Sequence, residues 1–270
     1  PLLAKAMRRV ARKVSAIAPR ATSETATPVD ESQPPAVVSE RFPVLMYHRV
    51  SPTGAAHTRR YRVTPEMFES QLAHLREAGY ASVSADELLE SIELRRSLPG
   101  KRVVLTFDDA YVDFAEFAWP LLQRYGFGAF LFVVSGCTGG TNAWDRRYGE
   151  ELPLLGWDAL RELQAAGVTI GAHTVSHPAL TGLSPREIAA EMAESRRTLQ
   201  EQLGTPIETI AYPYGDQDEI VEHIAGAAGF RLGFTCRLYP LHPHDPPLSL
   251  PRVEVEGTDS LETFIAKLTV

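Results

Sequence analysis

Two adjacent carboxylates follow a largely apolar segment of the chain. Residues 103–107 (Val-Val-Leu-Thr-Phe) lead directly into Asp108 and Asp109. A buried strand of this kind ends at the edge of a sheet, where barrel enzymes place catalytic groups. Because neighbouring side chains point in different directions, one carboxylate can bind a cation while the other faces a substrate. The alternative is that one of the two caps a helix that starts near Ala110.

A second segment of the same kind ends in histidines. Residues 168–172 (Val-Thr-Ile-Gly-Ala) lead into His173, and His177 follows four residues later. An isolated pair of histidines is more often a surface feature, but here imidazoles and carboxylates both follow buried strands of one predicted sheet. Two imidazoles and one carboxylate form a divalent-metal site with open positions for water and substrate.

From about Phe42 onward, runs of β-branched or aromatic residues alternate with helical patterns. These elements must position the carboxylates and imidazoles described above. Helix starts are indicated at Thr64, Ser84 and Ser184, each with proline or a capping-box glutamate behind it. The alternation favours an α/β fold, a distorted or incomplete (β/α)7 barrel of parallel strands, over an open doubly wound sheet. In either case the active site lies at the carboxyl ends of the strands. Strands are predicted at 44–48, 103–107, 129–134, 168–172, 207–211, 232–235 and 252–255.

Composition excludes several classes of protein. The 270 residues are 44% hydrophobic and 23% charged, enough to bury a core in one large domain or two small ones. The formal net charge is −7, and the acidic excess lies beyond residue 20, which argues against nucleic-acid binding. Two cysteines, Cys137 and Cys236, are too few for a disulfide framework or a zinc ribbon.

The head of the chain differs from the rest. Residues 1–20 hold basic residues and no acidic ones, and residues 1–18 show the spacing of a basic amphipathic helix. Two interpretations stay open, peripheral contact with an anionic membrane surface or a partly ordered appendage with a solvated basic face. Residues 19–40 are predicted to be a flexible linker and 41–270 the catalytic domain. No clear signal peptide is found, and a cytoplasmic or membrane-peripheral location is expected.

The motifs resemble those of the polysaccharide deacetylases, carbohydrate esterase family 4, also known as the NodB-homology domain. Residues 106–109 (Thr-Phe-Asp-Asp) resemble its first motif, which implies that Asp108 is the catalytic base and Asp109 a metal ligand. Residues 173–177 (His-Thr-Val-Ser-His) resemble its second motif, which implies that His173 and His177 complete the metal site. The resemblance covers about 42–270.

A third stretch, residues 211–215 (Ala-Tyr-Pro-Tyr-Gly), resembles the motif that lines the substrate groove, and we expect Pro213 and Tyr214 to contact substrate. The family places an arginine where this chain has Ala211. Arg252, at the start of the last predicted strand, is the candidate to replace it in orienting Asp108 and is counted among the substrate-binding residues. The alternative is a surface arginine at a strand end.

The general acid of the family is a histidine near the C-terminus, and this chain lacks that motif in its usual place. Residues 44–48 (Val-Leu-Met-Tyr-His) form a strand that ends in His48, which suits a circularly permuted member whose first and last strands are neighbours. We therefore expect His48 to protonate the leaving amine. His242, His244 and a purely structural His48 are the alternatives.

The resemblance implies a metal-dependent hydrolase that acts on carbon–nitrogen bonds other than peptide bonds. It would remove N-acetyl groups from an N-acetylhexosamine-containing polysaccharide, oligosaccharide or glycan precursor and release acetate, with a backbone N–H near Tyr214 holding the oxyanion. One divalent ion is expected, Zn²⁺ before Co²⁺, Ni²⁺ or Fe²⁺. The competing hypotheses are an amidase for a small amide or cyclic imide, an inactive carbohydrate-binding homologue, and an iron oxygenase. Oligomeric state is left open.

Overall fold

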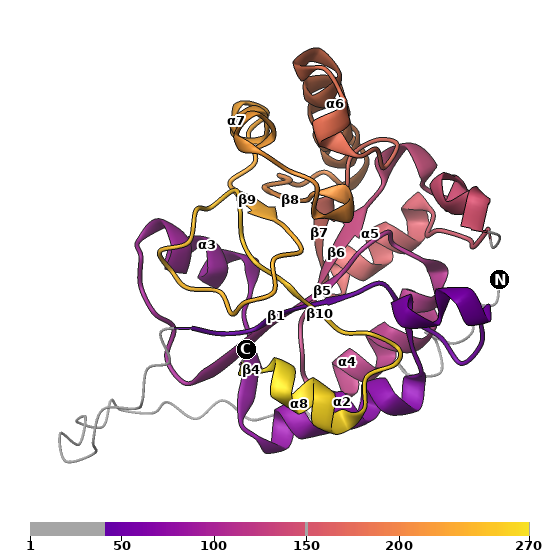
Figure 1. Cartoon of the computed structure of the whole chain (residues 1–270), viewed down its shortest axis with the longest axis vertical. Helices are drawn as coiled ribbons and strands as arrows, with labels where there is room; N and C mark the ends of the chain where they lie inside the picture. Colours follow the sequence, from indigo (N-terminus) through magenta and orange to yellow (C-terminus); the bar gives the residue numbers. More distant parts are fainter. Residues whose placement is uncertain (1–40, 149–150, 270) are drawn as a thin grey trace, which may run out of the picture. The chain divides into compact units, whose positions relative to one another are not determined.

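The computed structural model describes residues 41–148 and 151–269 (Figure 1). The helix and linker predicted for 1–18 and 19–40 lie outside the described residues. Within the described part, no helix is both long and apolar enough to span a bilayer.

All strands predicted from the sequence are present, with ends that differ by a few residues at most. The strands are β1 (Val44–Tyr47), β2 (Arg49–Val50), β3 (Arg62–Val63), β4 (Tyr80–Ser82), β5 (Lys101–Phe107), β6 (Phe130–Val133), β7 (Thr169–Ala172), β8 (Thr209–Ala211), β9 (Leu232–Phe234) and β10 (Val253–Glu254). Short β2 and β3 pair with each other, and β4 adds to β5. These three strands were not predicted, because they are too short to show a pattern.

The main sheet is parallel throughout and runs in the order β10-β1-β5-β6-β7-β8-β9. β1 therefore lies between the last strand and β5, with Leu45 opposite both Val253 and Leu105. An isolated parallel bridge joins Phe234 at the end of β9 to Leu250 just before β10. The sheet thus curls until its two edges nearly meet, which confirms the incomplete parallel barrel.

Successive apolar side chains along a strand belong alternately to two apolar clusters, one larger and one smaller. On β6, Leu131 and Val133 belong to the larger cluster, whereas Phe130 and Phe132 belong to the smaller one. The smaller cluster also takes Phe234 from β9, and the three phenylalanine rings lie 5.3–6.4 Å apart. Successive side chains of a strand face opposite sides of a sheet, so the wholly buried strands β1, β6, β8 and β9 are covered on both faces.

The helices pack on both sides of the sheet: most contribute to the larger apolar cluster, whereas Leu88, Leu89 and Ile92 of one helix belong to the smaller cluster. The helices are α2 (Pro65–Glu77), α3 (Ala85–Glu93), α4 (Trp119–Tyr125), α5 (Trp157–Ala165), α6 (Pro185–Leu203), α7 (Glu219–Ala227) and α8 (Leu261–Lys267), with a π-helical turn, η2 (Phe114–Ala118), before α4. Thr64, Ser84 and Ser184 cap α2, α3 and α6 as predicted, the last two through complete capping boxes. Figure 1 shows α8 beside α2, although the two are far apart in the sequence.

Short 3₁₀ segments occupy the loops. They are η1 (Ala56–Tyr61), η3 (Ser135–Cys137), η4 (Ala143–Tyr148), η5 (Leu180–Gly182) and η6 (Pro213–Gly215). In the chain, η1 follows β2, η3 and η4 follow β6, η5 follows β7 and η6 follows β8, so these segments come after carboxyl ends of strands, where the predicted site residues lie.

Candidate active site

Asp108 follows β5 and forms a bidentate ion pair with Arg252, whose side chain lies inside the curled sheet. Arg252 Nη1 donates to Asp108 Oδ1 at 2.6 Å, and Nη2 donates to Oδ2 at 2.8 Å. The arginine is fully buried, and its Nε donates to the carbonyl of Thr235 at 2.9 Å. Burial acts to raise the pKa of Asp108, but the attraction of Arg252 outweighs it and lowers the pKa to about 2. Asp108 is therefore ionised at neutral pH and held in one orientation.

Asp109, His173 and His177 converge at the carboxyl ends of β5 and β7. One potential ligand atom from each residue lies within 4.8 Å of the other two, and all three residues are buried. Asp109 Oδ1 is 3.6 Å from His173 Nε2 and 3.4 Å from His177 Nε2, longer than a normal charged hydrogen bond. Among the described residues, Asp109 Oδ1 has no hydrogen-bond partner. An orphaned buried oxygen facing two imidazole nitrogens fits a divalent cation of the kind that nitrogen and oxygen ligands hold.

The protonation states suit such an ion. Burial lowers the pKa of His173 to about 4 and that of His177 to about 2, so both rings are neutral at pH 7, the form that binds metals. Burial and the charge of Asp108 raise the pKa of Asp109. A cation at this position would relieve that repulsion and favour the carboxylate.

The two imidazoles are oriented in different ways. His173 Nδ1 lies 2.7 Å from the carbonyl oxygen of Ala211, which places a proton on Nδ1 and directs the free electron pair of Nε2 toward Asp109. His177 Nδ1 has no such partner among the described residues. Its ring instead stacks on Trp144 at 4.7 Å and meets the edge of Tyr214 at 4.7 Å. The orientation of His177 therefore depends on its backbone and on aromatic packing.

Backbone strain is concentrated at this site. Among the described residues, six residues other than glycine have positive φ, and five of them are site residues or their immediate neighbours: Asp109, Ala110, Thr174, His177 and Tyr214. The exception is Arg95. Such conformations cost free energy and persist where the surrounding structure imposes them, commonly at functional sites. Here they turn side chains from three strand ends toward one point.

A cavity of about 660 Å³ opens over Asp108 and over the group formed by Asp109, His173 and His177. His48, which follows β1, is half-buried in its wall, with its ring 5.2 Å from that of Tyr61. Burial lowers the pKa of His48, and the charges of Asp108 and Glu254 act against this shift. His242 and His244 are not among the described residues that line the cavity, and the role of His48 as general acid stays a prediction.

The structure separates the three residues predicted to contact substrate. Tyr214 lies on the cavity wall and is 56% exposed. Pro213 and Arg252 are both buried, and neither is among the described residues that line the cavity.

Neither Asp108 nor Asp109 caps the following helix, because η2 begins after Asp113 and has no side-chain cap.

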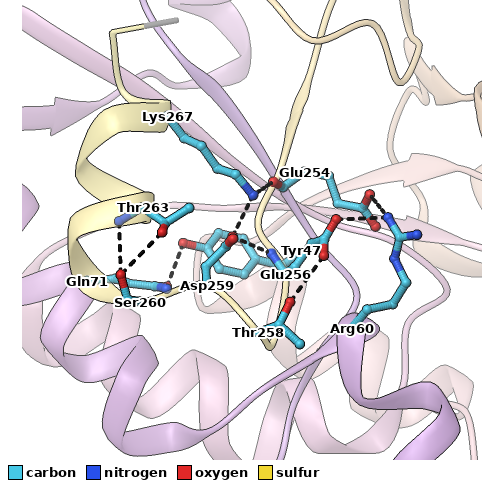
Figure 2. Close-up of polar contacts among 10 residues, drawn as sticks. All are labelled: Tyr47, Arg60, Gln71, Glu254, Glu256, Thr258, Asp259, Ser260, Thr263 and Lys267. Atoms are coloured by element: carbon cyan, nitrogen blue, oxygen red, sulfur yellow. Dashed lines mark hydrogen bonds and ion pairs between the residues drawn. The ribbon is translucent and has the colours of Figure 1, made fainter.

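One wall of the cavity was not foreseen. Segment η1 contributes His57, Thr58, Arg60 and Tyr61. Arg60 Nη2 donates to Glu254 Oε2 and to Glu256 Oε1, both at 2.9 Å (Figure 2). The backbone N–H of Gly257 donates to the carbonyl of Arg60 at 2.7 Å, and a side chain at position 257 would collide with the carbonyls of Arg59 and Arg62. The η1 wall is therefore fastened to the end of β10.

The C-terminal helix supports the same strand end. Lys267 of α8 donates to the carbonyl of Glu254 at 2.9 Å and to Asp259 Oδ2 at 2.6 Å, and Asp259 accepts from the N–H of Glu256 at 2.8 Å (Figure 2). A further set of wall residues comes from loops whose sequences carry no motif: Tyr111, Asn142, Trp144, Asp145 and Leu152. Trp144 could have been suspected only as a large aromatic residue in a stretch of small and polar ones.

Comparison with known proteins identifies the family to which this chain belongs. The sequence model of the polysaccharide deacetylase family matches residues 95–233. The chain belongs to the polysaccharide deacetylase family.

Particular relatives share 27–28% of aligned residues. The Bacillus subtilis (strain 168) protein YxkH, a polysaccharide deacetylase by name, is 28% identical over 195 residues, 72% of this chain and 64% of the relative. The poly-β-1,6-N-acetyl-D-glucosamine N-deacetylase of Escherichia coli (strain K12) is 27% identical over 259 residues, 84% of this chain and 38% of the relative. The chain thus spans less than two thirds of the length of each.

Solved structures match the domain more completely. The Streptococcus pyogenes deacetylase PplD, determined in complex with acetate, superposes with a TM-score of 0.75 at 28% identity. The match covers 85% of this chain and 99% of that one. The similarity includes the parallel barrel that carries the candidate site.

Proposed function

We propose that this chain is a divalent-metal-dependent deacetylase that hydrolyses N-acetyl groups on an N-acetylhexosamine-containing glycan and releases acetate. The observation that carries the proposal is an ionised, arginine-held carboxylate, Asp108, directly beside the Asp109–His173–His177 group below a cavity. Family membership supports this chemistry, as does the acetate in the Streptococcus pyogenes deacetylase.

The proposed cation ligands are Asp109, His173 and His177. Zn²⁺ is our first choice, because two imidazoles and a carboxylate form one of its catalytic ligand sets, with Co²⁺, Ni²⁺ and Fe²⁺ as alternatives. When bound, the ion would polarise the acetamide carbonyl and make a nearby water more acidic.

The protein groups have separate roles in this proposal. Asp108 accepts a proton from the attacking water, and Arg252 keeps that carboxylate ionised and correctly aimed. His48, which also lines the cavity, donates a proton to the departing amine. A backbone N–H near Tyr214 helps to hold the oxyanion of the tetrahedral intermediate. The acid must be protonated while the base is ionised, so the rate should be bell-shaped in pH.

For the substrate we propose β-1,6-linked N-acetylglucosamine oligomers or polymer. Support comes from the activity for which the Escherichia coli relative is named. Further support comes from the cavity wall, which combines Tyr61, Trp144 and Tyr214 with polar side chains, a composition typical of ligand sites.

The test is incubation of zinc-loaded protein with β-1,6- and β-1,4-linked N-acetylglucosamine oligomers and with small amides and cyclic imides. Mass spectrometry should show loss of acetyl groups, with matching acetate release, from the β-1,6-linked oligomers. Asp108→Asn should slow the reaction by about 10²- to 10⁴-fold, whereas Asp158→Asn, which alters a carboxylate exposed on α5, should leave the rate unchanged. Turnover of the small amides alone would replace the proposal with an amidase.

A further inference from the structure

The loop between the two histidines, residues 174–176, donates three hydrogen bonds to one carboxylate that is not part of the Asp109–His173–His177 group. Glu191, on α6, accepts hydrogen bonds at Oε2 from the N–H of Val175 at 2.8 Å and of Ser176 at 2.9 Å. Its Oε1 accepts from Ser176 Oγ at 2.6 Å. One side chain thus satisfies three donors of the segment that separates His173 from His177.

Other polar groups of this loop also have hydrogen-bond partners, all of them neutral; Thr174 Oγ1, for example, accepts from the N–H of His177 at 3.0 Å. The carbonyl of Thr174 accepts from Ser135 N at 3.1 Å and from Ser195 Oγ at 3.0 Å. The carbonyl of Val175 accepts from Gly136 N at 2.9 Å, and a side chain at Gly136 would collide with that carbonyl. These are neutral hydrogen bonds. Those to Glu191 involve a carboxylate and are the stronger kind.

The loop needs such a tether because its backbone is strained. Thr174 and His177 have φ of 64° and 63°, a region that residues with a side chain rarely adopt. The His177 ring has no hydrogen bond at Nδ1 among the described residues, so the position of its Nε2 depends on the backbone and on the packing of the ring against Trp144 and Tyr214. A relaxed loop would move Nε2 away from Asp109, whereas His173 would remain fixed by Ala211.

We propose that Glu191 is a positioning residue that sets the affinity of the Asp109–His173–His177 group for its cation. The proposal rests on the proposed function, since it requires that these residues bind a metal. It assigns to Glu191 no contact with substrate or cation. Supporting groups outside the ligand set typically change metal affinity by about 10- to 100-fold when removed.

The test is competitive titration of chelator-treated protein with Zn²⁺ against a chromophoric chelator. Glu191→Ala should weaken Zn²⁺ binding by about 10- to 100-fold. Glu191→Gln, which keeps a carbonyl oxygen for the two N–H donors but loses the charge, should fall between Ala and wild type. The matched control is Glu194→Ala on the same helix, where the carboxylate pairs with Arg197 and does not reach the loop; its affinity should equal that of wild type.

The thermal midpoint of the metal-free proteins separates positioning from general stability. We expect Glu191→Gln and Glu194→Ala to have similar midpoints but different zinc affinities. Should Glu191→Ala fail to fold, Glu191→Gln decides alone. Wild-type zinc affinity in both Glu191 variants would overturn the inference and leave the proposed function intact, whereas a wild-type protein that binds no divalent cation would refute the proposed function itself.

Discussion

Replacing Arg252 by methionine tests how the protein keeps Asp108 ionised. Methionine occupies similar space without charge, so Asp108 would stay buried without a partner. The pKa of Asp108 is about 2 in place of 3.8, a difference of about 2 kcal/mol in favour of the ionised form. Removing one partner of a buried ion pair costs about 3 to 5 kcal/mol. We therefore expect the variant to lose about 3 to 5 kcal/mol of unfolding free energy at pH 7.

The pH dependence has a definite sign. The stabilisation that Asp108 gains from its low pKa is fully present above 3.8 and is lost as the pH falls toward 2. In Arg252→Met the main interaction that opposes burial is gone, so we expect burial to raise the pKa of Asp108 above its ordinary value. The difference in stability between the two proteins should therefore be largest near neutral pH and shrink in acid.

The assay is urea unfolding of the metal-free proteins, followed by tryptophan fluorescence at several pH values. Arg231→Met is the control, because Arg231 is 43% exposed and pairs with Glu93 and Glu208 at the surface; it should cost under about 1 kcal/mol. If Arg252→Met costs no more than this control, or if its cost is the same at pH 3 and pH 7, the assigned role of the buried pair is wrong.

Four further substitutions separate the roles in the cavity. Asp108→Asn should keep the bound metal and lose about 10²- to 10⁴-fold in kcat, whereas Asp109→Asn should lose the metal; equal metal loss would contradict this division. His48→Ala should lower kcat without metal loss and should remove the alkaline limb of the rate profile. In wild type that limb reports loss of the His48 proton, at a pKa that burial lowers from 6.5; an unchanged limb would refute the assignment. Arg60→Ala removes the ion pairs that join the η1 wall to Glu254 and Glu256. We expect KM for oligomers to rise more than kcat falls. The reverse pattern would exclude a binding role for that wall.

The fold could be predicted because its strands are buried on both faces. Continuous apolar runs such as 103–107 and 129–134 show in the sequence, and each main-sheet strand was found. Capping residues such as Ser184 located helix starts, since a capping box is a local device. Strands β2, β3 and β4 escaped notice because two or three residues carry no period.

The candidate site was predictable where a residue directly follows a strand. His48, Asp108, Asp109 and His173 all do so, and the parallel sheet brings such ends together. Arg252 was suspected, and its long side chain reaches Asp108 through the barrel interior. The sequence did not reveal that Arg252 is fully buried and is not among the described residues that line the cavity.

Other parts of the site had no local signal. The η1 wall depends on Arg60 meeting Glu254, nearly the full domain apart in the chain. Glu191 reads as one more charged residue on a polar helix, because its role comes from the loop that α6 faces. Contacts of this kind exist only in the folded chain.

The central claim is that one divalent cation, held by Asp109, His173 and His177, is required for hydrolysis of N-acetyl groups by this chain. Its most direct test is to remove metal with a chelator, add back Zn²⁺ in fractions of an equivalent, and measure acetate release from a β-1,6-linked N-acetylglucosamine oligomer at each step. Activity should be absent without metal and rise in proportion to added ion up to one equivalent. Full acetate release from chelator-treated protein, or from His173→Ala protein that binds no metal, would contradict the claim.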